Sequence, residues 1–79
     1  MNYEYYLKMI KQAIKHINKS YSQLEKFYED SNLESCLNKE LLNLYNLGIY
    51  HITATDEILS NLEIELDIAE KKERHYEQL

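Results

Sequence analysis

The chain has 79 residues, the size of one small domain, and its 44% hydrophobic residues are enough for a modest core. The net charge of −5 argues against nucleic acid as the main partner. A single cysteine leaves no internal disulfide, and no apolar run is long enough for a membrane span or a signal peptide, which favours a cytoplasmic protein. With no proline and one glycine, the composition predicts a single all-α domain over residues 1–79.

A long amphipathic helix is predicted over residues 3–29. Apolar residues recur there at alternating spacings of four and three, which places them on one stripe of an α-helix. They are Tyr3, Leu7, Ile10, Ile14, Ile17, Tyr21, Leu24 and Tyr28. Asp30, Ser31 and Asn32 favour turns over helix interiors, so the helix is expected to end there.

A second helix is predicted to begin near Asn32, because Ser31 and Glu34 have the spacing of a capping box. Its stripe comprises Leu33, Leu37, Leu41 and Leu44, and Gly48 continues the same helical spacing. The chain is then expected to break at Gly48, which can close a helix in the left-handed conformation, and a third helix is expected to begin after Thr53. These boundaries give helices over residues 32–48 and 54–77.

One unbroken helix over residues 32–77 is the alternative to this break. Ten residues keep a single heptad frame across the region, as one continuous helix would. They are Leu41, Tyr45, Gly48, Ile52, Thr55, Leu59, Leu62, Leu66, Ala69 and Tyr76.

The distribution of charge favours three helices over two. Residues 8–19 contain four lysines and no acid, whereas residues 40–70 contain seven acids and neither Lys nor Arg. In an up-down-up bundle the lysines lie level with the acids around 60–70, but a hairpin turning near Ser31 would place them beside 42–53. We therefore predict a three-helix up-down-up bundle. The alternative is a long two-helix hairpin that dimerises through its overhanging end.

The residues that most often perform chemistry show no catalytic or metal-binding pattern. His16, His51 and His75 lack the Glu-x-x-His spacing of helical metal sites, and one glycine cannot form a phosphate-binding loop. No catalytic residue, metal or cofactor is predicted, and the chain is expected not to be an enzyme. One more specific hypothesis concerns His16. With Lys19 and Ser20 it resembles the exposed histidine of phosphotransfer domains, although Ser20 stands where those have glycine.

Five apolar side chains lie off the predicted core stripes and form the candidate partner-binding surface. They are Tyr5, Leu47, Tyr50, Ile64 and Ile68. Tyrosine and aliphatic side chains outside a core are typical of a surface that binds another protein or a second copy of the same chain. The equally weighted interpretation is that a small bundle wraps its last helix on two sides.

Two blocks of the sequence, roughly residues 10–32 and 58–76, contain a pattern that points to a family. Its residues are Lys11-Gln12, Leu24-Glu25, Phe27, Asn32, Ile58, Leu62-Glu63, Leu66, Glu70, Glu73 and Tyr76. The pattern resembles small helical proteins of unknown function from spore-forming Firmicutes, which are commonly encoded near spore membrane-channel genes of the germination apparatus. The chain departs from the family in the extra residues between the blocks and in Arg74, where the family has proline. The resemblance implies a sporulation setting and a non-enzymatic role, with no known active site.

The sequence therefore predicts a small, acidic, non-enzymatic protein that binds another protein or itself. The first hypothesis is a spore-associated interaction or structural protein, as the resemblance implies. The second is a small regulator or inhibitor of the phage or antitoxin type, which masks a basic protein surface with its acidic last helix. The third is the histidine phosphotransfer module.

Overall fold

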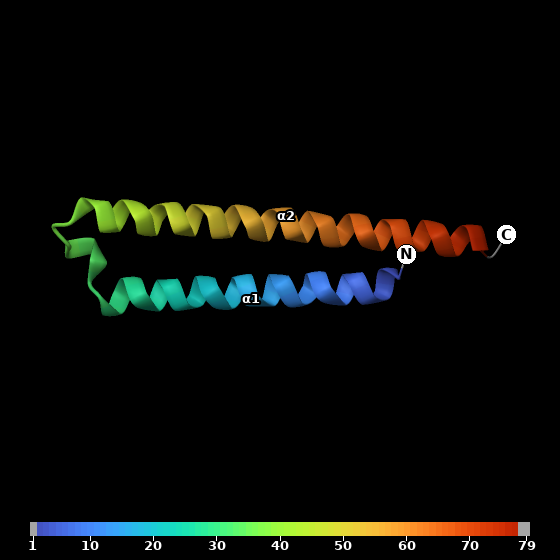
Figure 1. The fold of residues 1–79 in the computed structure, drawn as a ribbon, viewed down its shortest axis with the longest axis horizontal. Helices are drawn as coiled ribbons and strands as arrows, with labels where there is room; N and C mark the ends of the chain where they lie inside the picture. The colour runs from blue at the N-terminus through green and yellow to red at the C-terminus, as the bar shows by residue number, and fades with distance from the viewer. Residues whose placement is uncertain (1, 78–79) are drawn as a thin grey trace.

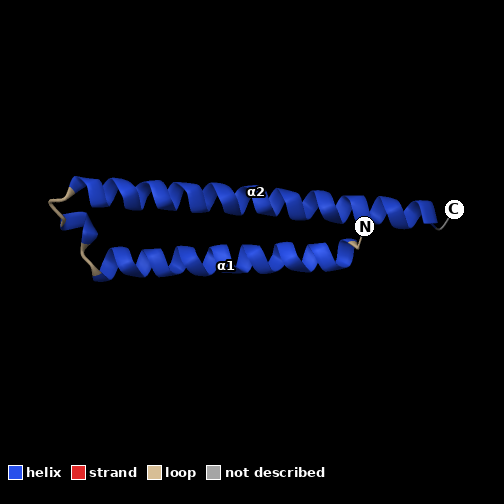
Figure 2. Ribbon diagram, in the orientation of Figure 1, coloured by secondary structure: helices blue, strands red, loops and turns tan. Residues whose placement is uncertain are grey.

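The chain folds into two long antiparallel helices joined at one end (Figure 1). A computed structural model describes residues 2–77, with side chains described up to residue 75. The helices are α1 (Tyr3–Asp30) and α2 (Lys39–Glu77), and the short 3-10 helix η1 (Leu33–Ser35) lies in the loop between them. Throughout this described range the chain is helix and loop, with no strand (Figure 2). The molecule is a rod measuring 65 × 16 × 13 Å.

Helix α1 confirms the first predicted element. Asn2 caps its start, because the Asn2 side-chain oxygen accepts a hydrogen bond of 3.1 Å from the backbone N–H of Tyr5. At the other end the Ser31 hydroxyl donates to the carbonyl oxygen of Phe27 over 2.6 Å. Seven of the eight residues in the predicted apolar stripe are half-buried, and the eighth, Tyr21, is 37% exposed. The stripe is therefore the side of α1 that meets α2.

The predicted three-helix bundle is wrong, because α2 continues without a break through residues 48–55. Gly48 has an ordinary negative φ and ends no helix. One glycine costs a helix about 1 kcal/mol, whereas most helical stability in proteins comes from packing an apolar side. Ile49 and Ile52, which lie within the expected break, are half-buried and belong to that apolar side. The observed fold is the long two-helix hairpin.

The start of α2 also differs from the prediction, since the helix begins at Lys39 and not near Asn32. The side-chain oxygen of Asn38 accepts hydrogen bonds from the backbone N–H groups of Glu40, at 3.1 Å, and Leu41, at 3.3 Å. Asn38 is thus the cap of α2. The expected capping box does not form, because the Ser31 hydroxyl is bound back to α1.

The loop between the helices is a compact structure of its own. Asn32 has φ 53°, in the left-handed region that Asn tolerates better than most residues. Leu33 follows and is 4% exposed, which makes it the one fully buried residue in the part of the chain that is described. Leu37, expected on the same stripe as Leu33, is 98% exposed. The predicted stripe of the second helix is therefore wrong: Leu33 is buried but lies outside α2, and Leu37, Leu41 and Leu44 are exposed.

The length of this loop, residues 31–38, sets the register of the two helices. Lys8 and Lys11 line the same groove as Asp67 and Glu70, so the basic part of α1 lies level with the acidic part of α2. The charge pattern that favoured three helices is satisfied by the hairpin, because the turn is centred several residues beyond Ser31. The overhang is also short, because Glu73 of α2 lies close enough to Tyr3, near the start of α1, to raise the pKa of the Tyr3 hydroxyl.

Aromatic rings close the hairpin near the loop. The rings of Tyr28 and Tyr45 stack with centroids 5.1 Å apart, and Phe27 lies at a tilt with its centroid 6.3 Å from that of Tyr45. Burial raises the pKa of Tyr45 above its usual value of 10.0, and the neighbouring Tyr21 and Glu25 raise it further. Burial and Glu73 raise the pKa of Tyr3 at the open end of the hairpin.

Candidate functional site

The contact between the helices is a narrow seam. On α1 it follows the apolar stripe already described. On α2 it consists of half-buried residues that recur at alternating spacings of three and four: Leu42, Tyr45, Ile49, Ile52, Asp56, Leu59, Glu63, Leu66 and Glu70. Three of these nine residues are acidic. Asp56 lies near the middle of α2, and Glu63 and Glu70 lie toward the open end of the hairpin. The seam alone is therefore a weak core, because it is narrow and part of it is charged.

The heptad frame predicted from Leu41 onward is correct at four of its nine described positions. Four residues of that frame lie in the seam, namely Tyr45, Ile52, Leu59 and Leu66. The apolar residues Leu41 and Leu62 of the frame are exposed. The seam contains Asp56 and Glu63 instead, which follow the frame positions Thr55 and Leu62 by one residue. The side chain of Tyr76, the last member of the frame, lies outside the described residues.

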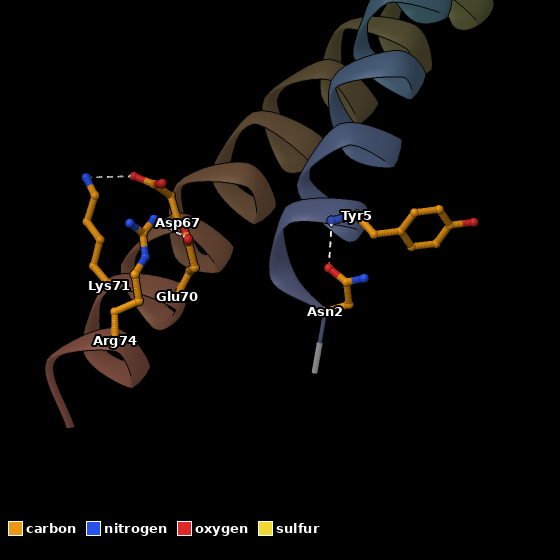
Figure 3. Close-up of polar contacts among 6 residues, drawn as sticks. All are labelled: Asn2, Tyr5, Asp67, Glu70, Lys71 and Arg74. Atoms are coloured by element: carbon orange, nitrogen blue, oxygen red, sulfur yellow. Dashed lines mark hydrogen bonds and ion pairs between the residues drawn. The ribbon is translucent and has the colours of Figure 1, made fainter. Parts of the chain in front are cut away.

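One long side of the hairpin is charged. A groove at the open end is lined by Glu4, Leu7, Lys8, Lys11, Asp67, Glu70 and Arg74. The Lys71 ammonium lies 3.0 Å from the Asp67 carboxylate, and the Arg74 guanidinium pairs with the Glu70 carboxylate (Figure 3). Exposed pairs of this kind are worth about 0–1 kcal/mol each. This charged side is therefore balanced and well solvated.

The opposite long side is apolar. A groove near the open end is lined by Tyr6, Met9, Ile10 and Leu66, with no charged residue. Positions that flank the seam on one side recur every seven residues in each helix, so the same side extends along the whole rod. We define the apolar face by its large exposed side chains: Tyr6, Met9, Phe27, Leu41, Leu44, Ile58 and Leu62. Each is between 42% and 66% exposed.

The five residues predicted to bind a partner are all exposed, but they lie elsewhere. Leu47 and Ile68 point away from α1 by helical spacing, and Tyr50 and Ile64 flank the charged side. The ring of Tyr5 projects from the outer side of α1, away from α2 (Figure 3). The structure brings Leu47 within one turn of Tyr50, and Ile64 within one turn of Ile68. Tyr5 stands apart from all four, so the five residues do not form one surface.

Sequence reasoning missed the apolar face because it assigned part of it to a core. Leu41 lies on the predicted stripe of the second helix, and Leu41, Gly48 and Leu62 all lie on the heptad frame, which treats them as positions that face another helix of the chain. The charge pattern of α1 could have revealed the apolar face. The positions of the face on α1, which are Tyr6, Met9, Ala13, His16, Ser20, Gln23 and Phe27, contain no Lys, Arg, Asp or Glu. An uncharged strip beside an amphipathic seam indicates a surface that something else covers.

The histidines are all at the surface. His16, His51 and His75 are exposed, and the ring of His51 lies edge-on to that of Tyr50, with centroids 5.4 Å apart. Within residues 2–77 no group of three His, Cys, Asp or Glu side chains is arranged to hold a metal ion. The phosphotransfer hypothesis for His16 stays a prediction.

Neither helix in the described range is both long and apolar enough to cross a membrane. Comparison of the chain with models of protein families, with curated proteins and with solved structures finds no match. The resemblance to the spore-associated family also stays a prediction.

Proposed function

We propose that the protein acts by binding a helical protein surface through its apolar face, as a non-enzymatic interaction module. The observation that carries the proposal is the location of the exposed apolar side chains. Among residues 2–75, fourteen large hydrophobic side chains are exposed, and seven of them share one side of a rod only 16 Å wide. Monomeric soluble proteins rarely leave so long an apolar strip uncovered, because it remains in contact with water at a cost in free energy.

The shape of the face supports a helical partner in particular. The two helices run side by side along the rod (Figure 1), and the positions of the face recur along each helix at spacings of three and four residues. An amphipathic helix or helix pair presents a matching stripe and fits the groove between two helices. An extended peptide would instead need an open sheet edge, and the described chain contains no strand.

The acidic helix offers less support for an inhibitor that covers a basic surface. Asp67 and Glu70 are paired with cations of their own helix, and Asp56 and Glu63 are half-buried in the seam. Much of the negative charge that such an inhibitor would present is therefore already in contact with this chain.

Photocrosslinking in the cells that produce the chain tests the proposal. Ile58, which is 66% exposed on the apolar face, is replaced by the photoreactive residue p-benzoylphenylalanine. Ile64, which is 55% exposed on the other side of α2, receives the same replacement as the matched control. We expect protein adducts from position 58 and few from position 64, with partners identified by mass spectrometry. Absence of adducts at position 58, or equal yields at both positions, would contradict the proposal.

A further inference from the structure

We propose that the apolar face is covered by a second copy of this chain, so that two hairpins form a four-helix bundle. The inference rests on the proposed function and names the partner. The exposed surface area of the hairpin is the first observation that supports it. The hairpin exposes 6644 Å², whereas a compact monomer of its 9.5 kDa mass exposes about 5000 Å². The surplus of about 1600 Å² exceeds the roughly 800 Å² that each partner loses in a stable protein–protein interface.

The incomplete core of the single hairpin also supports a second copy. Among the described residues only Leu33 is fully buried, and it lies in the loop and not between the helices. Every apolar residue of the seam keeps one edge in water, because two helices can cover each other on one side only. A second pair of helices on the apolar face would cover Ile10, Leu59 and Leu66 from that side. A four-helix bundle completes a core in this way.

A second copy fits the face in length. The apolar face reaches from Tyr6 near the open end to Leu41 near the loop, over most of a molecule 65 Å long. A partner must present an apolar strip that is equally long and straight. Another copy of the hairpin has such a strip by construction, and a two-fold axis brings the two strips together.

The charges also permit two copies to meet on this side. Each chain carries a net charge of −5, so association of like copies requires that their acids stay apart. The positions of the face on α2 between Leu41 and Ala69 contain one charged residue, Glu65. The paired acids Asp67 and Glu70 lie on the opposite, charged side. Two copies joined through their apolar faces therefore keep those carboxylates in solvent.

Gly48 removes one steric obstacle to this contact. It lies on the face between Leu44 and Thr55, and a Cβ atom built there meets no heavy atom within 4 Å. The backbone of α2 is open to close approach at this point, as it is where small residues lie at helix–helix contacts. A helix of a second copy therefore has room to approach α2 closely at Gly48.

Analytical ultracentrifugation of the full chain tests the proposal, with circular dichroism as a check on folding. We expect the wild type to sediment at micromolar concentration with twice the 9.5 kDa mass of one chain. Leu62→Glu places a carboxylate at the centre of the proposed interface on both copies. It should weaken association by about 100-fold or more while the helicity is retained. The matched control Ile64→Glu adds the same charge two residues away, on the other side of α2, and should remain dimeric.

The outcomes separate this inference from the proposed function. The dimer is overturned if the wild type still sediments as a monomer at 100 times the micromolar concentration. It is also overturned if Ile64→Glu dissociates the dimer and Leu62→Glu does not. If Leu62→Glu loses helicity as a monomer, Ile58→Glu replaces it, because that side chain is 66% exposed in the hairpin and its loss leaves the seam intact. A monomeric chain whose position 58 crosslinks to a different protein would overturn the second copy and support the proposed function. A monomer with no crosslinks would overturn both.

Discussion

The ring of Tyr28 in α1 stacks on the ring of Tyr45 in α2, with 5.1 Å between their centroids and 26° between their planes. Phe27 adds a tilted contact to Tyr45 at 6.3 Å. These rings join the two helices next to the loop, where the chain reverses direction. In a molecule with so little buried surface, each cross-helix contact of this size is a large share of the stability. Aromatic pairs contribute about 0.5–1.5 kcal/mol beyond the area that they bury.

A double-mutant cycle on Tyr28→Leu and Tyr45→Leu measures this contribution. Each single change should lower the free energy of unfolding by about 1–2 kcal/mol, and the coupling between the two should be about 1 kcal/mol. Urea unfolding followed by circular dichroism gives the values. Tyr5→Leu is the control, because the Tyr5 ring projects away from α2 (Figure 3) and pairs with the ring of Tyr6 in the same helix. A coupling energy near zero would show that the stacking adds nothing to burial.

Removal of the cap on α2 should destabilise the hairpin. Asn38→Ala deletes the oxygen that accepts hydrogen bonds from Glu40 and Leu41, and the expected loss is about 1 kcal/mol in the free energy of unfolding. Glu34→Gln alters the residue that the sequence pairs with Ser31, and it should change stability by less than about 0.5 kcal/mol. The reverse order of effects would mean that the second helix begins at Ser31 after all.

Replacement of the single glycine should stabilise the chain. Gly48→Ala finds open space for its methyl group and an ordinary backbone conformation, so the gain is about 0.5–1 kcal/mol from helix propensity. The measurement is best made in a Leu62→Glu background, where association through the apolar face does not contribute. Loss of stability or helicity would instead indicate that residue 48 needs a conformation that only glycine adopts.

Alkaline pH should unfold the hairpin, and Tyr45 should account for part of the effect. Its pKa is raised above 10.0 in the folded chain by burial and by its aromatic and acidic neighbours. The unfolded chain therefore loses this proton first as the pH rises past about 10, and the free energy of unfolding falls from that pH until the folded pKa is passed. Below pH 10 the contribution is fully present.

Thermal unfolding at a series of pH values from 8 to 12 measures this effect. Tyr45→Phe should flatten the alkaline decline, and Tyr3→Phe should do the same at the open end, where Glu73 also raises the pKa of Tyr3. Tyr50→Phe, on the outer side of α2, serves as the control. An alkaline decline of equal steepness in the wild type and in Tyr45→Phe would contradict the assignment.

The sequence predicted α1 well because a single physical cause determines it. Apolar residues from Tyr3 to Tyr28 repeat at one spacing, no competing signal occurs among them, and Asn2 and Ser31 close the two ends. Periodicity along one helix depends only on residues close in sequence. No knowledge of the rest of the chain was needed.

The later part of the chain was harder because local signals conflicted with packing. Gly48 and the β-branched residues near it favour a break, but the contact of Ile49 and Ile52 with α1 outweighs that preference. Ser31 and Asn38 are both good capping residues, and only the loop geometry decides between them. The apolar face was hidden for a related reason. Whether Leu41 and Leu62 are core or surface depends on the number of helices.

Cys36 gives the rod a distinguishable end. It is the only thiol in the sequence, it lies in the loop, and it is partly accessible. One probe attached there marks one tip of each molecule, so two associated rods report their polarity directly. Loops at the same tip would place the two probes a small fraction of the rod apart, whereas loops at opposite tips would separate them by nearly the full 65 Å. A single spin–spin distance then decides how the two copies are aligned.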